Sequence, residues 1–208
     1  MERSQQALIV VDVQNDFVSG ALAIAGAETI IEPINRLLAH APVAVLSLDW
    51  HPPDHVSFAS AHPGASPGDE IETVYGTQRV YADHCVQGSW GAEPDSHLHV
   101  DRAQLILRKG FVAGLDAFSA FVANDGRTPS GLSGYLRSRG VERIFVAGLA
   151  RFGCVLRTAV DAAADGYEVF LVDDASKGNA RMSDDEGNRI LDSNRITVIP
   201  SQQVLQMF

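Results

Sequence analysis

The sequence predicts an α/β fold, a doubly wound and mostly parallel β-sheet with helices on both faces. Short, nearly continuous apolar runs alternate along the chain with segments whose apolar residues recur at helical spacing. Strands that alternate with helices are typical of parallel sheets, and strands covered on both faces are apolar throughout rather than at every second residue. These two observations together favour this fold class over an antiparallel one.

The first elements establish the alternation. The run Ala7–Val13 (ALIVVDV) is expected to be the first strand because almost every residue in it is apolar. The isoleucines and leucines of Ile30–Leu38 then recur at the spacing of an amphipathic helix. Val43–Leu48 (VAVLSL) returns to a continuous apolar run and is expected to be the second strand.

The later elements follow the same two patterns. The helix near the carboxyl terminus is expected to begin at Ser183, since Ser183-Asp184-Asp185-Glu186 matches a capping box, and to run to about Leu191. The other expected elements, in chain order, are strand Ala103–Leu107, a short helix at Gly131–Ser138, strand Arg143–Ala147, helix Cys154–Ala164, strand Glu168–Val172 and strand Arg195–Ile199.

Composition indicates one globular domain that spans residues 1–208. The chain is 46% hydrophobic and 20% charged, and its formal net charge is -10, which argues against nucleic acid or an anionic membrane as a partner. We expect a cytoplasmic protein, because no signal peptide or membrane-length apolar stretch is evident and the two cysteines do not form a disulfide scaffold. A Cys85–Cys154 bridge and a homo-oligomer both remain open.

Residues 49–100 interrupt the alternation and are rich in Pro, Gly, His and Asp. Long irregular stretches inside compact domains are commonly functional or disordered. This stretch holds six of the seven histidines, so we expect a metal-binding loop region. The six are His51, His55, His62, His84, His97 and His99.

Chemically useful side chains stand where the predicted strands end. Asp12 follows the first strand, Asp49 and His51 the second, and Lys109 the third, while the fourth leads to Cys154. Ligands of open parallel sheets bind at the carboxyl ends of the strands. An acid, a pair of metal-ligand residues, a cation and a thiol are therefore expected at one edge of the sheet.

Cys154, Asp12 and Lys109 suit nucleophilic catalysis. Cys154 is expected near the start of a helix, where free N–H groups and the helix dipole lower a thiol's pKa and bind an oxyanion. Asp12 interrupts an apolar strand end and could exchange a proton with the thiol. Lys109 would lower the pKa of both groups. Each of these residue types has a commoner role when it is taken singly. A cysteine is more often a buried apolar residue, and a lysine at a strand end is more often solvated. An aspartate is more often a turn residue, a role that Asp16 suits better than Asp12.

The pattern Asp49-Trp50-His51 suits a metal, because residues two apart in an extended segment project to the same side. His84 from the long loop would supply a third ligand and leave positions for water or substrate, as in catalytic sites. His55 would be a fourth ligand or would support another ligand. Zinc is the default ion, with iron or manganese as alternatives. Cys85, beside His84, is expected to be a structural thiol.

Several strings in the chain resemble one family. They are VVDVQNDF, DWHPPDHVSFAS, DHCVQGSWGAE, RKGF followed by DAFSAF, and VAGLARFGCVLRTAVDA. In this order they resemble the nicotinamidase family of isochorismatase-like cysteine hydrolases, and the likeness runs from about Ala7 to Lys177. It implies an amidohydrolase that converts nicotinamide to nicotinate and ammonia through a thioester.

The resemblance also implies roles for single residues. Asp12, Lys109 and Cys154 match the catalytic triad, and a cis peptide between Leu149 and Ala150 would place the N–H of Ala150 beside that of Cys154 as an oxyanion hole. Asp49, His51 and His84 match the ligands of one divalent ion that binds the pyridine nitrogen. The residues expected to contact substrate are Phe17, Tyr81 and Leu149.

This chain departs from the family pattern at two places that bear on its substrate. Ala150-Arg151-Phe152-Gly153 precedes the nucleophile where the family usually has Ala-Thr-Asp and an aromatic residue or histidine, and Tyr81-Ala82 replaces the usual Trp-Pro. The first run is closer to relatives that hydrolyse N-carbamoyl amides or maleamate, for which Arg151 could pair with a substrate carboxylate. Such an amide hydrolase, or an inactive binding module on the same fold, remains an alternative.

Overall fold

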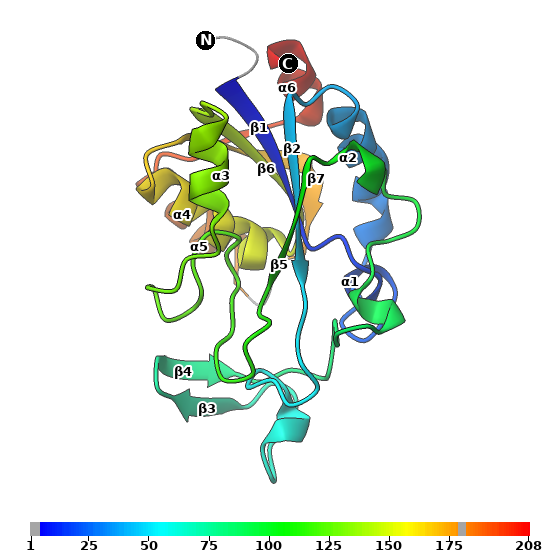
Figure 1. Cartoon of the computed structure of the whole chain (residues 1–208), viewed down its shortest axis with the longest axis vertical. Coiled ribbons are helices and arrows are strands. Elements are labelled where there is room, and N and C mark those ends of the chain that lie inside the picture. The colour runs from blue at the N-terminus through cyan, green and yellow to red at the C-terminus, as the bar shows by residue number, and fades with distance from the viewer. Residues whose placement is uncertain (1–4, 179–181) are drawn as a thin grey trace.

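The computed structural model describes residues 5–178 and 182–208, and its centre is a six-stranded sheet (Figure 1). The strand order is β5-β2-β1-β6-β7-β8, and every neighbouring pair is parallel. The predicted doubly wound parallel sheet is thereby confirmed. The strands are β1 (Gln6–Val11), β2 (Val43–Asp49), β5 (Leu105–Lys109), β6 (Arg143–Leu149), β7 (Glu168–Lys177) and β8 (Thr197–Ile199).

Helices cover both faces of this sheet because its central strands are apolar on both sides. In β1, Ala7, Ile9 and Val11 pack into one buried cluster, whereas Leu8 and Val10 pack into a second. Residues of α3 (Leu132–Ser138), α4 (Leu156–Ala164) and α5 (Asp184–Ser193) complete the first cluster, and residues of α2 (Ile31–Leu38) and α6 (Ser201–Met207) the second. Among the described residues, no helix has the length and apolar character that crossing a bilayer requires.

All six predicted strands and four predicted helices are present within a few residues of their expected bounds. The N–H of Glu186 donates to the Ser183 hydroxyl over 3.2 Å, which confirms the capping residue of α5. The helix expected from Cys154 begins later, at Leu156, because Arg151–Val155 form a tight irregular turn with non-helical backbone at Phe152 and Gly153.

The structure also contains elements that the patterns did not predict. The loop region holds an antiparallel hairpin, β3 (Glu70–Thr73) with β4 (Gly76–Arg79), whose residues are largely polar and exposed and therefore lack an apolar alternation. Two short helices, α1 (Asn15–Val18) and α6, were also missed. Figure 1 shows the hairpin beyond the carboxyl ends of β2 and β5, on the side where the predicted functional residues emerge.

The order of the strands creates a switch point beside β1. The chain adds β2 and β5 on one side of β1, then returns to add β6, β7 and β8 on the other. Loops from neighbouring strands diverge at such a point and leave a crevice at the carboxyl edge. Gly148 permits the close approach of β6 to β1 there, since its φ is +120° and a Cβ atom on it would lie 2.1 Å from the carbonyl oxygen of Val11.

Gly148→Ala should therefore lower the free energy of unfolding by about 3 kcal/mol or more, because it adds both a backbone clash and an unfavourable φ. Urea denaturation would measure the change. Gly134→Ala, in α3 with open space around its Cβ, is the matched control and should raise stability by about 0.5–1 kcal/mol. Equal stabilities for the two variants would show that the β1–β6 contact tolerates a side chain.

Candidate active site

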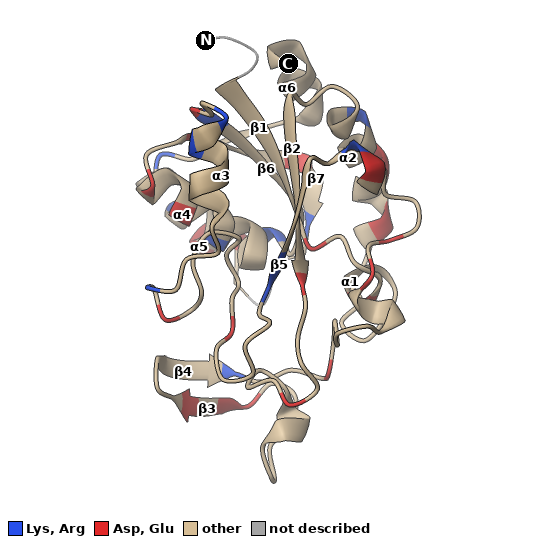
Figure 2. Cartoon of the chain, in the orientation of Figure 1, with Lys and Arg blue, Asp and Glu red and all other residues tan. Residues whose placement is uncertain are grey.

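A buried lysine connects the carboxyl ends of three strands. Lys109 is the last residue of β5, is 2% exposed and is the register partner of Asp49, the last residue of β2. Its Nζ lies 2.9 Å from Asp12 Oδ2 and 2.6 Å from Asp49 Oδ1 and donates to the Ala117 carbonyl over 2.9 Å. Figure 2 shows the basic end of β5 beside the acidic end of β2. Burial alone would lower the pKa of Lys109. The two carboxylates outweigh this effect and raise the pKa well above its ordinary value.

Asp12 follows β1 directly and is fully buried, with φ at 53°. Its N–H donates to the Ser47 carbonyl over 2.9 Å, and the Ser47 hydroxyl donates to Asp12 Oδ1 over 3.1 Å. Burial raises the pKa of Asp12 to about 7, an effect that Lys109 opposes and Asp49 increases. A carboxyl group that titrates near neutrality can accept a proton and return it under ordinary conditions.

The sulfur of Cys154 completes this group. Sγ lies 3.7 Å from Lys109 Nζ, and Sγ and one carboxylate oxygen each of Asp12 and Asp49 lie within 4.8 Å of one another. The structure thus brings together the thiol, carboxyl group and ammonium that the sequence places at three separate strand ends. This convergence was the central expectation of the sequence patterns.

The expected lowering of the Cys154 pKa is wrong. Burial raises the pKa of this thiol, the opposing charge of Lys109 does not offset that effect, and Asp12 and Asp49 add to it. Cys154 also lies in the irregular turn before α4 rather than in a regular first helical turn, so the expected help of a helix dipole is weaker. The surroundings therefore favour the protonated thiol, and a potential base lies beside it.

The backbone before Cys154 has the form that the resemblance implied. The peptide between Leu149 and Ala150 is cis. The N–H groups of Gly153 and Val155 donate to the Ala150 carbonyl over 2.9 and 3.2 Å, which fixes the turn. Within residues 5–178 and 182–208, the N–H of Ala150 has no hydrogen-bond acceptor, so it can donate to a bound molecule.

Asp49, His51 and His84 form a set that could hold a metal ion, since one ligand atom from each lies within 4.8 Å of the others. The Nδ1 atoms of His51 and His84 each lie 2.8 Å from a backbone carbonyl, of Gly110 and Ala82 respectively. A carbonyl can only accept, so these contacts place the proton on Nδ1 of a neutral ring and leave Nε2 for a metal. Burial and the neighbouring His51 lower the pKa of His84, which favours its neutral form.

His55 packs against this set. Its ring stacks on that of His51 with 4.1 Å between centroids, and its Nδ1 lies 2.7 Å from the Ser57 hydroxyl. His55, His51 and Asp116 form a second group with ligand atoms within 4.8 Å of one another. Because the His51 and His55 planes differ by 25°, their in-plane lone pairs run nearly side by side. This geometry suits support of His51 better than joint ligation of one ion.

Two residues that the sequence patterns did not single out as functional hold the metal-ligand set in place. The buried Gln14 side chain accepts from the Asp49 N–H and donates to the Asp49 carbonyl, both over 2.8 Å, which fixes the end of β2. Asp16 accepts from the N–H groups of Ala21 and Cys85, and so anchors the loop beside His84. Gln14 lies between Val13 and the polar Asn15 and carried no distinct signal in the sequence. Asp16, expected to be a turn residue, lies in α1, and its Oδ1 accepts from the Ala21 N–H in the segment that follows.

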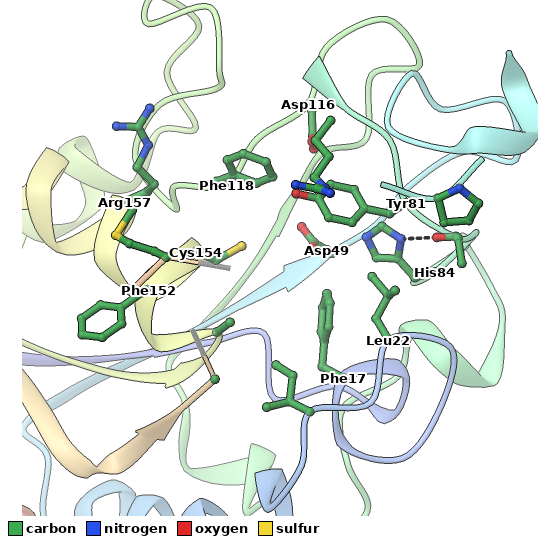
Figure 3. Close-up of a pocket in the computed structure, with 18 of the residues that line it drawn as sticks. Phe17, Leu22, Asp49, Tyr81, His84, Asp116, Phe118, Phe152, Cys154 and Arg157 are labelled. Carbon is green, nitrogen blue, oxygen red and sulfur yellow. Dashed lines mark hydrogen bonds between the residues drawn. The ribbon is translucent and has the colours of Figure 1, made fainter. Parts of the chain in front are cut away.

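A cavity of about 810 Å³ opens over the group (Figure 3). Phe17 and Tyr81 line it as expected, and Phe118, which the sequence patterns missed, lines it as well. In Figure 3 these aromatic side chains stand around the space between Cys154 and the Asp49 and His84 side chains. A flat aromatic molecule fits such walls.

Two expectations about this cavity need correction. Leu149 is fully buried in the core cluster with α2 and is not among the cavity's lining residues, so its side chain packs the core and does not contact substrate. Arg151 also faces elsewhere, because it pairs with Asp173 and lines a separate cavity behind the turn. An Arg151 contact to a substrate carboxylate therefore has no support.

The two cysteines are both free, so no Cys85–Cys154 bridge is present. Cys85 is fully buried, and burial together with nearby carboxylates raises its pKa. The Cys85 sulfur lies 3.8 Å from the Gly91 carbonyl, whereas the sulfur beside Lys109 is that of Cys154. These surroundings agree with the expected structural thiol.

Residues 6–203 match the isochorismatase domain family. A nicotinamidase of Acinetobacter baylyi is 46% identical over 172 residues, which cover 82% of this chain and 80% of that protein. The solved structure of an Acinetobacter baumannii nicotinamidase and pyrazinamidase has a TM-score of 0.94 at 42% identity and covers 97% of this chain and 98% of that one. The structure of PnC1 from L. infantum, solved in complex with nicotinate, has a TM-score of 0.85 at 32% identity, with 97% and 96% covered.

A more distant structure bears on the ligand set. A pyrazinamidase from Pyrococcus horikoshii, solved in complex with zinc, has a TM-score of 0.72 at 31% identity and covers 94% of this chain and 99% of that one. An N-carbamoylsarcosine amidase from Thermoplasma acidophilum has a TM-score of 0.70 at 23% identity, which shows a shared fold.

Replacement of Lys109 should expose how strongly the buried acids depend on it. Lys109→Met should lower the free energy of unfolding at neutral pH by about 3–5 kcal/mol, because Asp12 and Asp49 would remain buried without their cation. The loss should shrink at lower pH, where the acids take up protons. Urea denaturation at both pH values measures this. Arg36→Met, which removes an exposed pair with Glu32, should leave stability nearly unchanged, and an equally small effect of Lys109→Met would contradict the inference.

Proposed function

The chain belongs to the isochorismatase family, and from that premise we propose that it is a cysteine amidohydrolase that converts nicotinamide to nicotinate and ammonia. One observation carries the chemistry: the partly buried thiol of Cys154, a buried carboxyl group and a buried ammonium meet within contact range beneath an aromatic cavity. The names of the relatives, and the nicotinate in one of their structures, support the choice of amide.

The first half of the reaction forms a thioester. Cys154 Sγ attacks the carboxamide carbon while the thiol proton passes to Asp12. The N–H groups of Ala150 and Cys154 donate to the oxyanion that develops on the carboxamide oxygen. When the carbon–nitrogen bond breaks, the departing nitrogen takes the proton from Asp12 and leaves as ammonia. The near-neutral pKa of Asp12 suits both of these transfers.

The second half returns the enzyme to its starting state. A water molecule gives a proton to Asp12 and attacks the thioester carbon, and the carbon–sulfur bond breaks. Cys154 regains a proton from Asp12, and nicotinate leaves. Lys109 contacts Asp12 and Cys154 throughout, so its charge offsets the negative charge that moves between them.

The donor set of Asp49, His51 and His84 fits one divalent ion, and we propose zinc, with iron or manganese as alternatives. Two imidazoles whose Nδ1 atoms face carbonyls, together with a carboxylate, are ligands that all three metals accept. When bound, the ion supplies a Lewis-acid contact for the pyridine nitrogen. The zinc in the related pyrazinamidase supports this choice. Phe17, Tyr81 and Phe118 would hold the ring between them.

Purified protein should release ammonia from nicotinamide, and Cys154→Ala should reduce this rate by roughly three orders of magnitude or more, because no other described group replaces the nucleophile. A coupled ammonia assay measures both. Cys85→Ala is the matched control and should retain near wild-type activity. Release from maleamate or an N-carbamoyl amide, but not from nicotinamide, would overturn the substrate and keep the reaction class.

Removal of a ligand should remove the metal. His84→Ala should weaken zinc binding at least about tenfold, measured by titration of metal-free protein and by metal analysis. His97→Ala, which alters an exposed histidine paired with Asp95, is the control and should bind zinc normally. Unchanged binding by His84→Ala would place the metal elsewhere or show that none belongs here.

A further inference from the structure

The cavity is larger than a single-ring amide requires. Its volume of about 810 Å³ lies near the upper end of the range that encloses drug-sized ligands. A ring whose carboxamide reaches Cys154 and whose nitrogen faces Asp49 and His84 occupies only the inner part. The departing nitrogen must face Asp12, which is fully buried, so substituents on the amide nitrogen have no room there. The spare volume therefore lies on the ring side, toward the mouth.

The outer part of the cavity is apolar. Its partly exposed lining residues come from the segment after α1 and from the segment before α5, and they are Leu22, Ile24 and Met182. Phe152 and Leu156 also line the cavity but are buried in the core cluster behind it. These side chains offer an extended aromatic group a surface to pack against.

Two arginines, Arg79 and Arg157, complete this outer lining. Arg79, at the end of β4, uses one N–H to donate to the Gly68 carbonyl, and in the described part of the chain Arg157 has no acidic partner. Figure 3 shows Arg157 on the Cys154 side of the cavity, away from His84. The lining acids are already engaged, because Asp49 pairs with Lys109 and Asp116 accepts from Gln78 and the Ala117 N–H. The mouth thus favours a negatively charged group.

We propose that this chain also hydrolyses larger aromatic primary amides, whose ring carries an apolar extension that ends in a carboxylate. The bond broken and the products are those of the proposed function, on which this inference rests: the carboxamide takes up water and yields a carboxylate and ammonia. The extension lies along the outer apolar wall, and its carboxylate enters the mouth that Arg79 and Arg157 line, where their positive charges favour it.

The test compares three amides in the zinc-loaded enzyme. They are nicotinamide, a nicotinamide with a carboxyphenyl group on the ring carbon meta to both the ring nitrogen and the carboxamide, and its neutral hydroxymethylphenyl counterpart. Both extended amides should release ammonia, and kcat/KM should be higher for the carboxylate. Arg79→Gln and Arg157→Gln should each lower kcat/KM for the carboxylate amide by roughly fivefold, as expected for one exposed ion pair, and leave that for nicotinamide unchanged. Arg108→Gln, which removes an arginine stacked on Trp50 outside the cavity, is the control and should change none of the three values.

The outcomes separate this inference from the proposed function. If nicotinamide releases no ammonia, the proposed function fails. If nicotinamide is hydrolysed but neither extended amide is, the inference about the outer cavity is overturned. If both extended amides are hydrolysed equally and the arginine variants change nothing, the assignment of a carboxylate to the mouth is overturned.

Discussion

An ammonium group without access to water holds the centre of this protein together. Transfer of Lys109 from water costs several kcal/mol, and the cost is recovered only if its donors meet well-placed acceptors. Asp12, Asp49 and the Ala117 carbonyl are those acceptors, and each carboxylate in turn needs Lys109 to remain ionised in the same dry surroundings. The three strand ends that carry these residues therefore fix one another's positions.

Sheet register is what makes this mutual dependence achievable. Parallel pairing sets Asp49 opposite Lys109, and the approach of β6 to β1 at Gly148 brings the turn with Cys154 to the same edge. Backbone contacts then fix the angles: Gln14 grips both polar groups of the Asp49 backbone, and the Ser47 carbonyl holds the N–H of Asp12. A rigid sheet edge thus presents reacting groups that loops alone would hold less accurately.

The strands and the five candidate site residues at their ends could be predicted from the sequence, because burial on two faces leaves a continuous apolar run and a polar residue at its end is conspicuous. The hairpin β3–β4 could not be predicted, since its exposed polar residues carry no periodic signal.

Leu149 and Arg151 were misassigned because sequence does not show the direction of a side chain. Adjacency to Ala150 in sequence does not tell which way a side chain points when the backbone turns sharply, and these two face the core and a separate cavity. The pKa of Cys154 was misjudged because sequence shows a nearby cation but not the loss of water around it.

That loss of water shapes the proton chemistry of the site. Burial raises the pKa of both Asp12 and Cys154, and a full negative charge on each would place two anions within 4.8 Å of each other with a single lysine between them. Burial therefore opposes ionisation of both groups at the same time, and the protonation of each affects that of the other. In the proposed reaction, a carbonyl carbon accepts the sulfur's electrons while Asp12 takes the thiol proton. The negative charge then moves onto an oxygen that backbone N–H groups can meet, and the site gains no second buried charge.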